Sequence, residues 1–144
     1  MKTALTPIPY LDPQTNKEKV CYRPYVRVLL ISSKGHRAGK PIESLIDTGA
    51  DFNVFPWEYA EAFLGFSDKT LRKGTHLDIT GVGDAKKEGY GHRCTIHHPD
   101  FRIENANIFF VKNQPCPLLG RVGFMDQFRK IIIDEENKTL ELIK

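Results

Sequence analysis

The residues best suited to chemistry lie in the segment Leu45–Asp51, which reads Leu-Ile-Asp-Thr-Gly-Ala-Asp. An apolar run ends here in a carboxylate, a small hydroxyl residue and a glycine. We expect Leu45 and Ile46 to end a buried strand, so that Asp47 lies where the strand leaves the core. A carboxylate in such a place is unfavourable unless it is hydrogen-bonded, paired or used in a reaction. The alternative is a plain turn in which Asp47 bonds only its own backbone.

A second candidate is the glycine-rich segment Gly81-Val82-Gly83-Asp84. It lies between two strand-like segments, His76–Thr80 and His92–His97, and glycine tolerates backbone conformations that other residues avoid. We therefore predict a hairpin whose tip can bend over a neighbouring site. A phosphate-binding loop is disfavoured, because no Gly-Lys-Ser or Gly-Lys-Thr follows the glycines.

The histidines and cysteines invite a metal-site interpretation, which their spacing does not favour. His92, Cys94 and His98 share one face of a strand while His97 points away. No second cluster of Cys and His completes four ligands, so we predict no metal and no other cofactor. The chain has three cysteines, Cys21, Cys94 and Cys116. An odd number of widely spaced cysteines predicts reduced, structural thiols rather than disulfides.

Composition restricts the class of protein. The chain has 144 residues, 40% of them hydrophobic and 27% charged, with a formal net charge of +3. This length favours one domain with a real core. Lys and Arg are scattered, so we expect no nucleic-acid partner. The absence of a long apolar run predicts no membrane partner, and residues 1–10 lack an apolar signal core, which favours a cytoplasmic location.

The remaining elements are mostly strands. We divide the chain into an N-terminal extended arm, residues 1–19, and a folded domain, residues 20–144, and we expect the arm to pack on the body or on a partner. Short helices are predicted over Trp57–Leu64 and Phe124–Phe128, with Leu71–Gly74 as a linker. Such a chain is an all-β, barrel-like domain. The predicted strands are Tyr25–Ile31, Pro41–Ile46, His76–Thr80, His92–His97, Phe101–Val111 with an irregularity near Asn105 or Asn107, Ile131–Ile133 and Thr139–Ile143.

Four stretches, in this order, resemble the retroviral-type aspartic proteases (retropepsins) and their cellular and bacterial relatives. They are Leu45–Asp51, Gly81-Val82-Gly83, the strand pair His92–Val111, and Leu118-Leu119-Gly120-Arg121 before a short helix. The resemblance covers Tyr25 to Phe128. It implies a closed acid-protease barrel of one lobe with a flap hairpin, and an endopeptidase activity that needs no cofactor. The long terminal hairpin is more similar to the cellular Ddi-type members than to the viral ones.

One chain carries one Asp-Thr-Gly, whereas the reaction needs two carboxylates facing one water. We therefore expect a symmetric homodimer acting on polypeptides, with one Asp47 from each chain. The resemblance implies that Thr48 bonds across the two-fold axis, that Gly49 accepts from the substrate backbone and that Arg121 pairs with Asp51. Ordinary core packing stays an alternative for Val54 and Leu118. The residues implied to contact substrate are Ala50, Asp51, Val54, Gly81, Val82, Gly83, Pro117 and Leu118.

The sequence departs from the family pattern at three positions. Asn53 replaces a Ser or Thr, Val122 replaces an Asp or Asn, and Asp84 replaces a further glycine of the flap. The first two positions commonly support the catalytic loop together. An alternative function is therefore a catalytically weak or inactive peptide-binding or dimerisation module on the same fold. We expect the terminal hairpin, especially Thr139–Ile143, to supply edge strands at the dimer seam.

Overall fold

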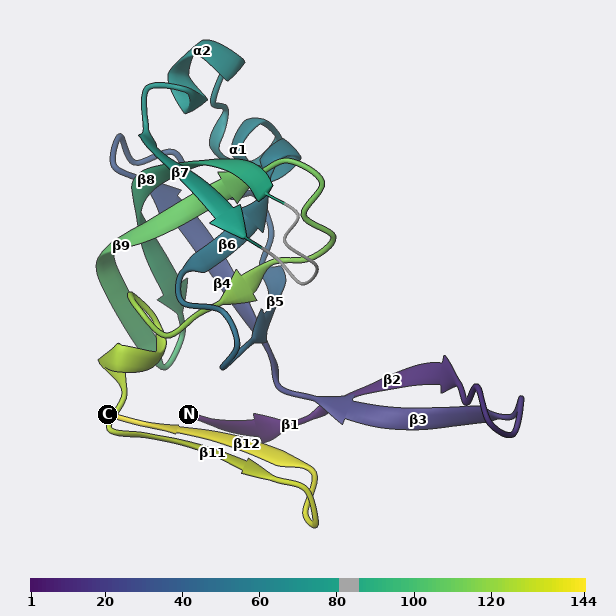
Figure 1. Cartoon of the computed structure of the whole chain (residues 1–144). Helices are drawn as coiled ribbons and strands as arrows, with labels where there is room; N and C mark the ends of the chain where they lie inside the picture. Colours follow the sequence, from purple (N-terminus) through teal and green to yellow (C-terminus); the bar gives the residue numbers. More distant parts are fainter. Residues whose placement is uncertain (81–85) are drawn as a thin grey trace.

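The computed structural model describes residues 1–80 and 86–144, and its body is a closed barrel of strands (Figure 1). Strands join in the order β4-β5-β10-β6-β9-β8-β7, and β4 also pairs with β8. Six strands therefore close on themselves, while β7 pairs only with β8 among the described strands. The predicted all-β lobe is confirmed. Its strands are β4 (Tyr25–Ser32), β5 (Ile42–Ile46), β6 (Asn53–Pro56), β7 (Thr75–Thr80), β8 (Lys86–His98), β9 (Phe101–Val111) and β10 (Leu118–Leu119).

Alternation along the strands fills the barrel with apolar side chains. In β4, Val26, Val28 and Leu30 are buried while the residues between them are more accessible, as a strand with one inward face requires. The predicted irregularity in β9 is present at Asn105, which has a positive φ of 56°. Between Cys94 and Ile96 of β8 the register with β9 shifts, so an extra β9 residue forms a bulge there.

Two short α-helices cover one end of the barrel. Helix α1 (Trp57–Leu64) begins after Pro56 and ends at Gly65, whose φ of 65° is left-handed, as the proline and glycine predict. Helix α2 (Asp68–Leu71) was not predicted. Ser67 caps it by accepting a hydrogen bond from the Thr70 N–H at 3.1 Å, and its last residue, Leu71, is the first residue of the expected linker. A third helix, η1 (Met125–Gln127), is a 3₁₀ turn within the predicted segment. No helix in the described ranges is long and apolar enough to cross a membrane.

The two ends of the chain meet in a separate three-stranded sheet of order β1-β12-β11 (Figure 1). It consists of β1 (Lys2–Ala4), β12 (Thr139–Ile143) and β11 (Lys130–Asp134). The terminal hairpin therefore supplies one edge strand, β11, and the expectation is wrong for Thr139–Ile143. Strand β12 is central, because β1 pairs with its second side through Lys2–Glu141, Thr3–Leu140 and Ala4–Thr139.

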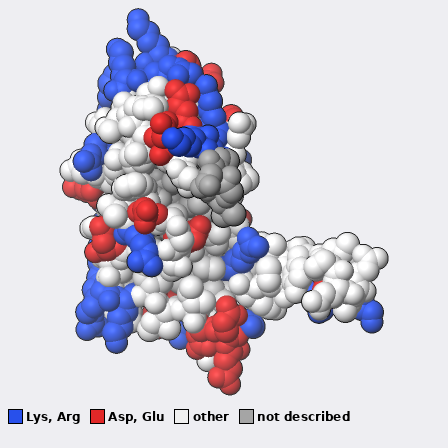
Figure 2. Space-filling view, in the orientation of Figure 1, with Lys and Arg blue, Asp and Glu red and all other residues white. Residues whose placement is uncertain are grey.

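Residues 1–19, expected as one extended arm, contain β1, β2 and the first two residues of β3. After β1, strand β2 (Thr6–Leu11) pairs with β3 (Glu18–Arg23) as an antiparallel hairpin. From here on, the arm means this hairpin, Thr6–Arg23, and not the whole of residues 1–19. It projects away from the barrel (Figure 1) and is largely uncharged on the face in view (Figure 2). Its six residue pairs run from Thr6–Arg23 to Leu11–Glu18.

Candidate active site

Asp47 follows directly after β5, at the point where that strand leaves the barrel. Strand β5 is held on one side by β4 and on the other by the short parallel strand β10, with Leu45 opposite Leu118 and Ile46 opposite Leu119. The Asp47 N–H continues this pattern and donates to the Leu119 carbonyl at 3.1 Å. The backbone of Asp47 is therefore fixed by the barrel, while its side chain is half-buried at the surface.

The Asp-Thr-Gly turn positions the carboxylate itself. The Gly49 N–H donates to Asp47 Oδ1 at 2.8 Å, and the Ala50 N–H donates to the Asp47 carbonyl at 3.2 Å. A Cβ on Gly49 would lie 3.2 Å from Oδ1, so glycine leaves this contact uncrowded. One carboxylate oxygen is thus held by the turn. Thr48 and Gly49 are exposed.

A second segment, Gly120–Val122, supports the turn from behind. The Arg121 N–H donates to the Ala50 carbonyl at 2.9 Å, and the Val122 N–H donates to the Asp51 carbonyl at 2.8 Å. Arg121 Nε donates to the Thr48 carbonyl at 2.9 Å. The expected ion pair between Arg121 and Asp51 is absent from the described residues of this chain. Instead the guanidinium binds the loop backbone, and both side chains are exposed.

Asn53, one of the departures from the family pattern, joins three segments from a fully buried position. Its Oδ1 accepts from the Gly120 N–H at 3.0 Å, and its Nδ2 donates to the Asn107 carbonyl of β9 at 3.3 Å. Close packing surrounds this contact, since a Cβ on Gly120 would lie only 2.3 Å from the Phe52 carbonyl oxygen. Val122 contributes a backbone bridge to Phe52, and its side chain is exposed.

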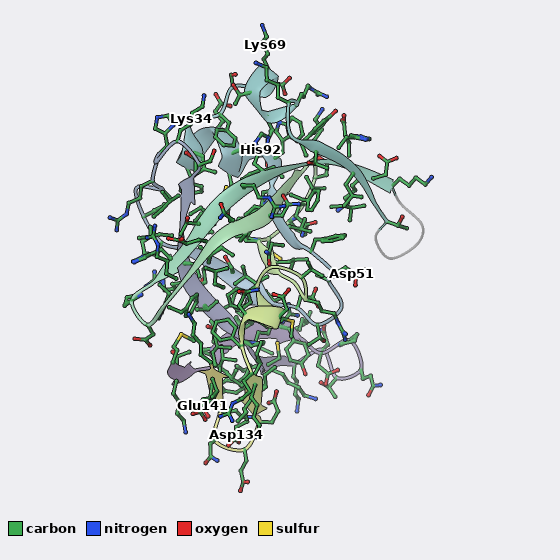
Figure 3. All side chains as sticks on the ribbon, turned by 90° about the vertical axis from the view of Figure 1, so that its left-hand side faces the viewer. Lys34, Asp51, Lys69, His92, Asp134 and Glu141 are labelled. Atoms are coloured by element: carbon green, nitrogen blue, oxygen red, sulfur yellow. The ribbon has the colours of Figure 1, made fainter. Side chains whose placement is uncertain are left out.

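A cleft of about 670 Å³ opens beside the Asp47 carboxylate. Its apolar walls come from β6, β7 and β10 and from the loop after Asp47. Phe52, Val54, Leu77, Ile79 and Leu118 line it, and they pack with Phe109 and Val111 in a cluster separate from the main core. The Phe52 and Phe109 rings meet at 5.3 Å between centroids. Figure 3 shows Asp51, another lining residue, at the outer edge of the barrel.

The cleft includes most of the described residues predicted to contact substrate. It is lined by Ala50, Asp51, Val54 and Leu118. Val54 also belongs to the apolar cluster that is separate from the main core. Pro117 does not line the cleft: the residue is buried, and its carbonyl accepts from the Leu45 N–H at 2.9 Å. Gly81, Val82 and Gly83 lie outside the described residues.

Several lining residues were not predicted from the sequence. Leu77 and Ile79 are less exposed than their neighbours in β7. The alternation of apolar and polar residues in this strand could have predicted that they share one face. Nothing in the sequence around Phe52 predicted that it lines the cleft, apart from its place in the loop after Asp47. The polar residues that also line the cleft are Asp78, Thr80, Lys87 and Gln114.

His92 and Cys116, which were considered as a metal ligand and a redox group, contact other parts of the fold. His92 Nε2 lies 2.7 Å from the Leu71 carbonyl oxygen, so this ring connects β8 to α2. No group of three or more potential ligands that could hold a metal occurs in the described part of the chain. Burial raises the pKa of the Cys116 thiol; the positive charge of Arg23 opposes this shift and the negative charge of Asp47 adds to it. The thiol therefore favours its protonated, unreactive form.

Solved structures with the same arrangement are aspartic proteases and a protease-like domain. A retropepsin-like aspartic protease from Rickettsia conorii aligns with a TM-score of 0.56 at 20% identity, over 83% of this chain and 94% of that chain. The retroviral protease-like domain of Ddi1 from Leishmania major aligns with a TM-score of 0.50 at 14% identity, over 82% and 87%. The fold is retropepsin-like.

A third retropepsin-like neighbour is the EIAV protease complexed with the inhibitor HBY-793. It aligns with a TM-score of 0.44 at 24% identity, over 69% of this chain and 82% of that chain. No protein-family model matches the sequence, and neither does any curated protein. The structural alignments with the Rickettsia and Leishmania proteins establish the retropepsin-like fold, and the function is argued from the site itself.

Proposed function

We propose that this chain is an aspartic endopeptidase that hydrolyses peptide bonds of polypeptides as a homodimer, with one Asp47 from each chain. The observation that supports it most is the placement of the Asp47 carboxylate. The Gly49 N–H holds it at the rim of an apolar cleft, on a retropepsin-like fold. A cleft with apolar walls and a few polar groups suits a ligand that is oriented by its backbone and selected by its side chains.

A second copy is needed because one chain contributes one such carboxylate. The surroundings of Asp47 agree with a contact surface: Thr48, Asp51 and Arg121 are all exposed in the single chain. In an isologous contact the same residues meet from both sides. A two-fold axis beside Asp47 would therefore bring two carboxylates together and cover the exposed loop with its own copy.

The reaction follows from two close carboxyl groups. Both cannot ionise comfortably, so the pair holds one proton. The ionised Asp47 removes a proton from a water molecule, whose oxygen attacks the carbonyl carbon of the scissile peptide bond. The protonated Asp47 donates a hydrogen bond to the carbonyl oxygen, and a proton is delivered to the amine as the C–N bond breaks. This route requires no covalent intermediate and no metal.

The cleft determines which segment of a polypeptide can bind. Leu77 and Ile79 of β7 line it together with Val54 and Leu118, so an extended peptide would place apolar side chains against these residues. Strand pairing with a neighbouring backbone supplies affinity that is independent of sequence. We therefore expect cleavage between residues with apolar side chains.

The alternative is a peptide-binding or dimerisation module that lacks useful turnover. It is favoured by the different support of the catalytic loop, in which buried Asn53 and exposed Val122 occupy positions where the family has other residues. Such a module would bind the same extended peptides and release them intact.

A peptide-library cleavage assay between mildly acidic and neutral pH separates these functions. We expect the wild-type protein to cleave and Asp47→Asn to be inactive while it stays folded and dimeric. Asp78→Asn, which changes a carboxylate elsewhere in the cleft, is the matched control and should retain cleavage. Equal cleavage by wild type and Asp47→Asn, or none by a wild-type dimer that binds peptide, would reject the endopeptidase.

A further inference from the structure

The arm carries an apolar face that its own chain leaves largely uncovered. Directly opposed residues of an antiparallel pair point to the same face, and the register places Pro7 with Tyr22, Pro9 with Val20, and Leu11 with Glu18. Five of these six side chains are apolar. Leu11 is 62% exposed and Val20 is 51% exposed. We call this surface the proline face of the arm.

The arm makes few contacts with the rest of its own chain. Near its base, Lys138 Nζ lies 4.8 Å above the Tyr22 ring, and the Leu5 N–H before the arm donates to the Lys138 carbonyl at 2.8 Å. At its tip, Asp12 accepts from Thr15 and Gln14 and pairs with Lys19, so the turn is internally ordered. Because an isolated two-stranded hairpin is marginally stable in water, an arm of this kind gains from a surface to pack against.

The edge of β2 is poorly suited to strand addition. Proline has no N–H, and Pro7 and Pro9 remove donors from one strand of the arm. Such substitution is a common way in which proteins protect exposed strands from unwanted pairing. The surface that remains available for a specific contact is therefore the proline face, which would bind through its side chains.

The arm begins beside the catalytic loop. The Ile46 N–H, one residue before Asp47, donates to the carbonyl of Pro24 at 3.0 Å, and Pro24 directly follows β3. Arg23 is the last residue of β3. Its positive charge lowers the pKa of the Cys116 thiol, and the negative charge of Asp47 raises it. The base of the arm and the reactive carboxylate are thus fixed in one small region.

We propose that the proline face of the arm packs on a second copy of this chain and clamps the two barrels together. This inference rests on the proposed two-chain active site. If both Asp47 residues approach one two-fold axis, the base of each arm is near that axis as well. Six residues of strand extend about 20 Å, and the arm points away from its own barrel (Figure 1). A second barrel joined at Asp47 is the neighbour within its reach.

The test compares the two faces of the arm by sedimentation equilibrium. The double variant Leu11→Asp, Val20→Asp places charges on the proline face, and Tyr10→Asp places one on the opposite face, where Tyr10 is 43% exposed. We expect the dimer dissociation constant to rise by about tenfold or more for the double variant and by less than about twofold for Tyr10→Asp. Circular dichroism should show the barrel folded in both.

The outcomes separate this inference from the proposed function. A wild-type dimer whose affinity is unchanged by the double variant, or weakened equally by Tyr10→Asp, would overturn the arm contact and leave the two-chain site standing. A wild-type protein that stays monomeric at high concentration would overturn both.

Amide hydrogen exchange of the wild-type protein gives a second measurement that needs no variant. The N–H groups of Val20 and Tyr22 should exchange more slowly in the dimer than in diluted monomer. Equal exchange in the two states would contradict a buried arm, whatever the variants do.

Discussion

At the scale of single residues, the hydrogen bonds that support the loop after Asp47 differ from those that the resemblance implies, and the buried polar groups of Asn53 still have partners. Asn53 is fully buried, yet its amide accepts from the Gly120 N–H and donates to the Asn107 carbonyl. A buried N–H without a partner is much less favourable than an exposed one. The substitution at position 53 therefore changes the chemistry of the support while it retains a hydrogen bond to the segment behind Asp47.

Replacing Asn53 tests this support. We expect Asn53→Ala to lower the free energy of unfolding by about 1–3 kcal/mol, because the Gly120 N–H loses its partner in the core. Urea denaturation measures the change. Gln14→Ala, an exposed side chain in the arm turn, is the control and should have little effect. A loss for Asn53→Ala no larger than that control would show that the amide is not a support.

Gly120 is the second residue whose replacement is informative. A Cβ there would lie 2.3 Å from the Phe52 carbonyl oxygen and 2.8 Å from that of Ala50, so backbone must shift. Since Leu119 binds the Asp47 N–H, we expect Gly120→Ala to reduce kcat/KM for peptide cleavage by about tenfold or more and to lower Tm. Gly39→Ala, with nothing within 4 Å of the new methyl group, should leave both unchanged. Equal effects of the two variants would reject this account.

At the scale of elements, strands β7 and β8 are anchored by a network of aromatic and charged side chains at the end near α2. Arg72 lies 5.2 Å from the Trp57 ring centroid and 5.8 Å from that of Tyr90, and its Nη1 is 3.1 Å from Glu88 Oε1. Tyr90 donates to the same Glu88 oxygen at 2.8 Å. Glu88 thus joins α2 to β8, next to the strand that carries Leu77 and Ile79.

This network predicts an acid sensitivity. The hydrogen bond from Tyr90, assisted by the charges of Arg72 and Lys112, holds the pKa of Glu88 below its ordinary value of 4.5. Because the pKa of Glu88 is lowered in the folded state, its ionised form stabilises the fold above about pH 4.5. This stabilisation is lost as the pH falls through the pKa that Glu88 has in the folded protein. We expect Tm to fall more steeply below about pH 4.5 in wild type than in Glu88→Gln. Parallel Tm profiles from pH 6 to 3 would contradict this role.

The elements differ in how much of their structure the sequence predicts. Helix α1 has Pro56 before it and Gly65 after it, and those residues act locally. Helix α2 has only four residues and one buried side chain, Leu71, so no apolar period reveals it. The position of β12 between β1 and β11 could not be predicted, because the pairing joins residues from opposite ends of the chain.

At the scale of the whole molecule, the site joins three distant parts of the chain. The position of Asp47 directly after β5 is local, and the apolar run before it predicts this position. The cleft walls depend on how β7 and β10 approach the loop after Asp47, which explains why Leu77 and Ile79 were missed and why Pro117 lies outside the lining. Pairing between strands that are distant in the sequence determines these contacts, so residue spacing along the chain does not predict them.

Mixing active and inactive chains tests most directly whether each active centre needs two copies of Asp47. Wild type and Asp47→Asn are combined at constant total concentration, allowed to exchange subunits, and assayed for peptide cleavage. If both carboxylates are required, activity should fall as the square of the wild-type fraction, to about one quarter in an equal mixture. A linear fall to about one half would show that each chain acts alone and would contradict the shared active centre.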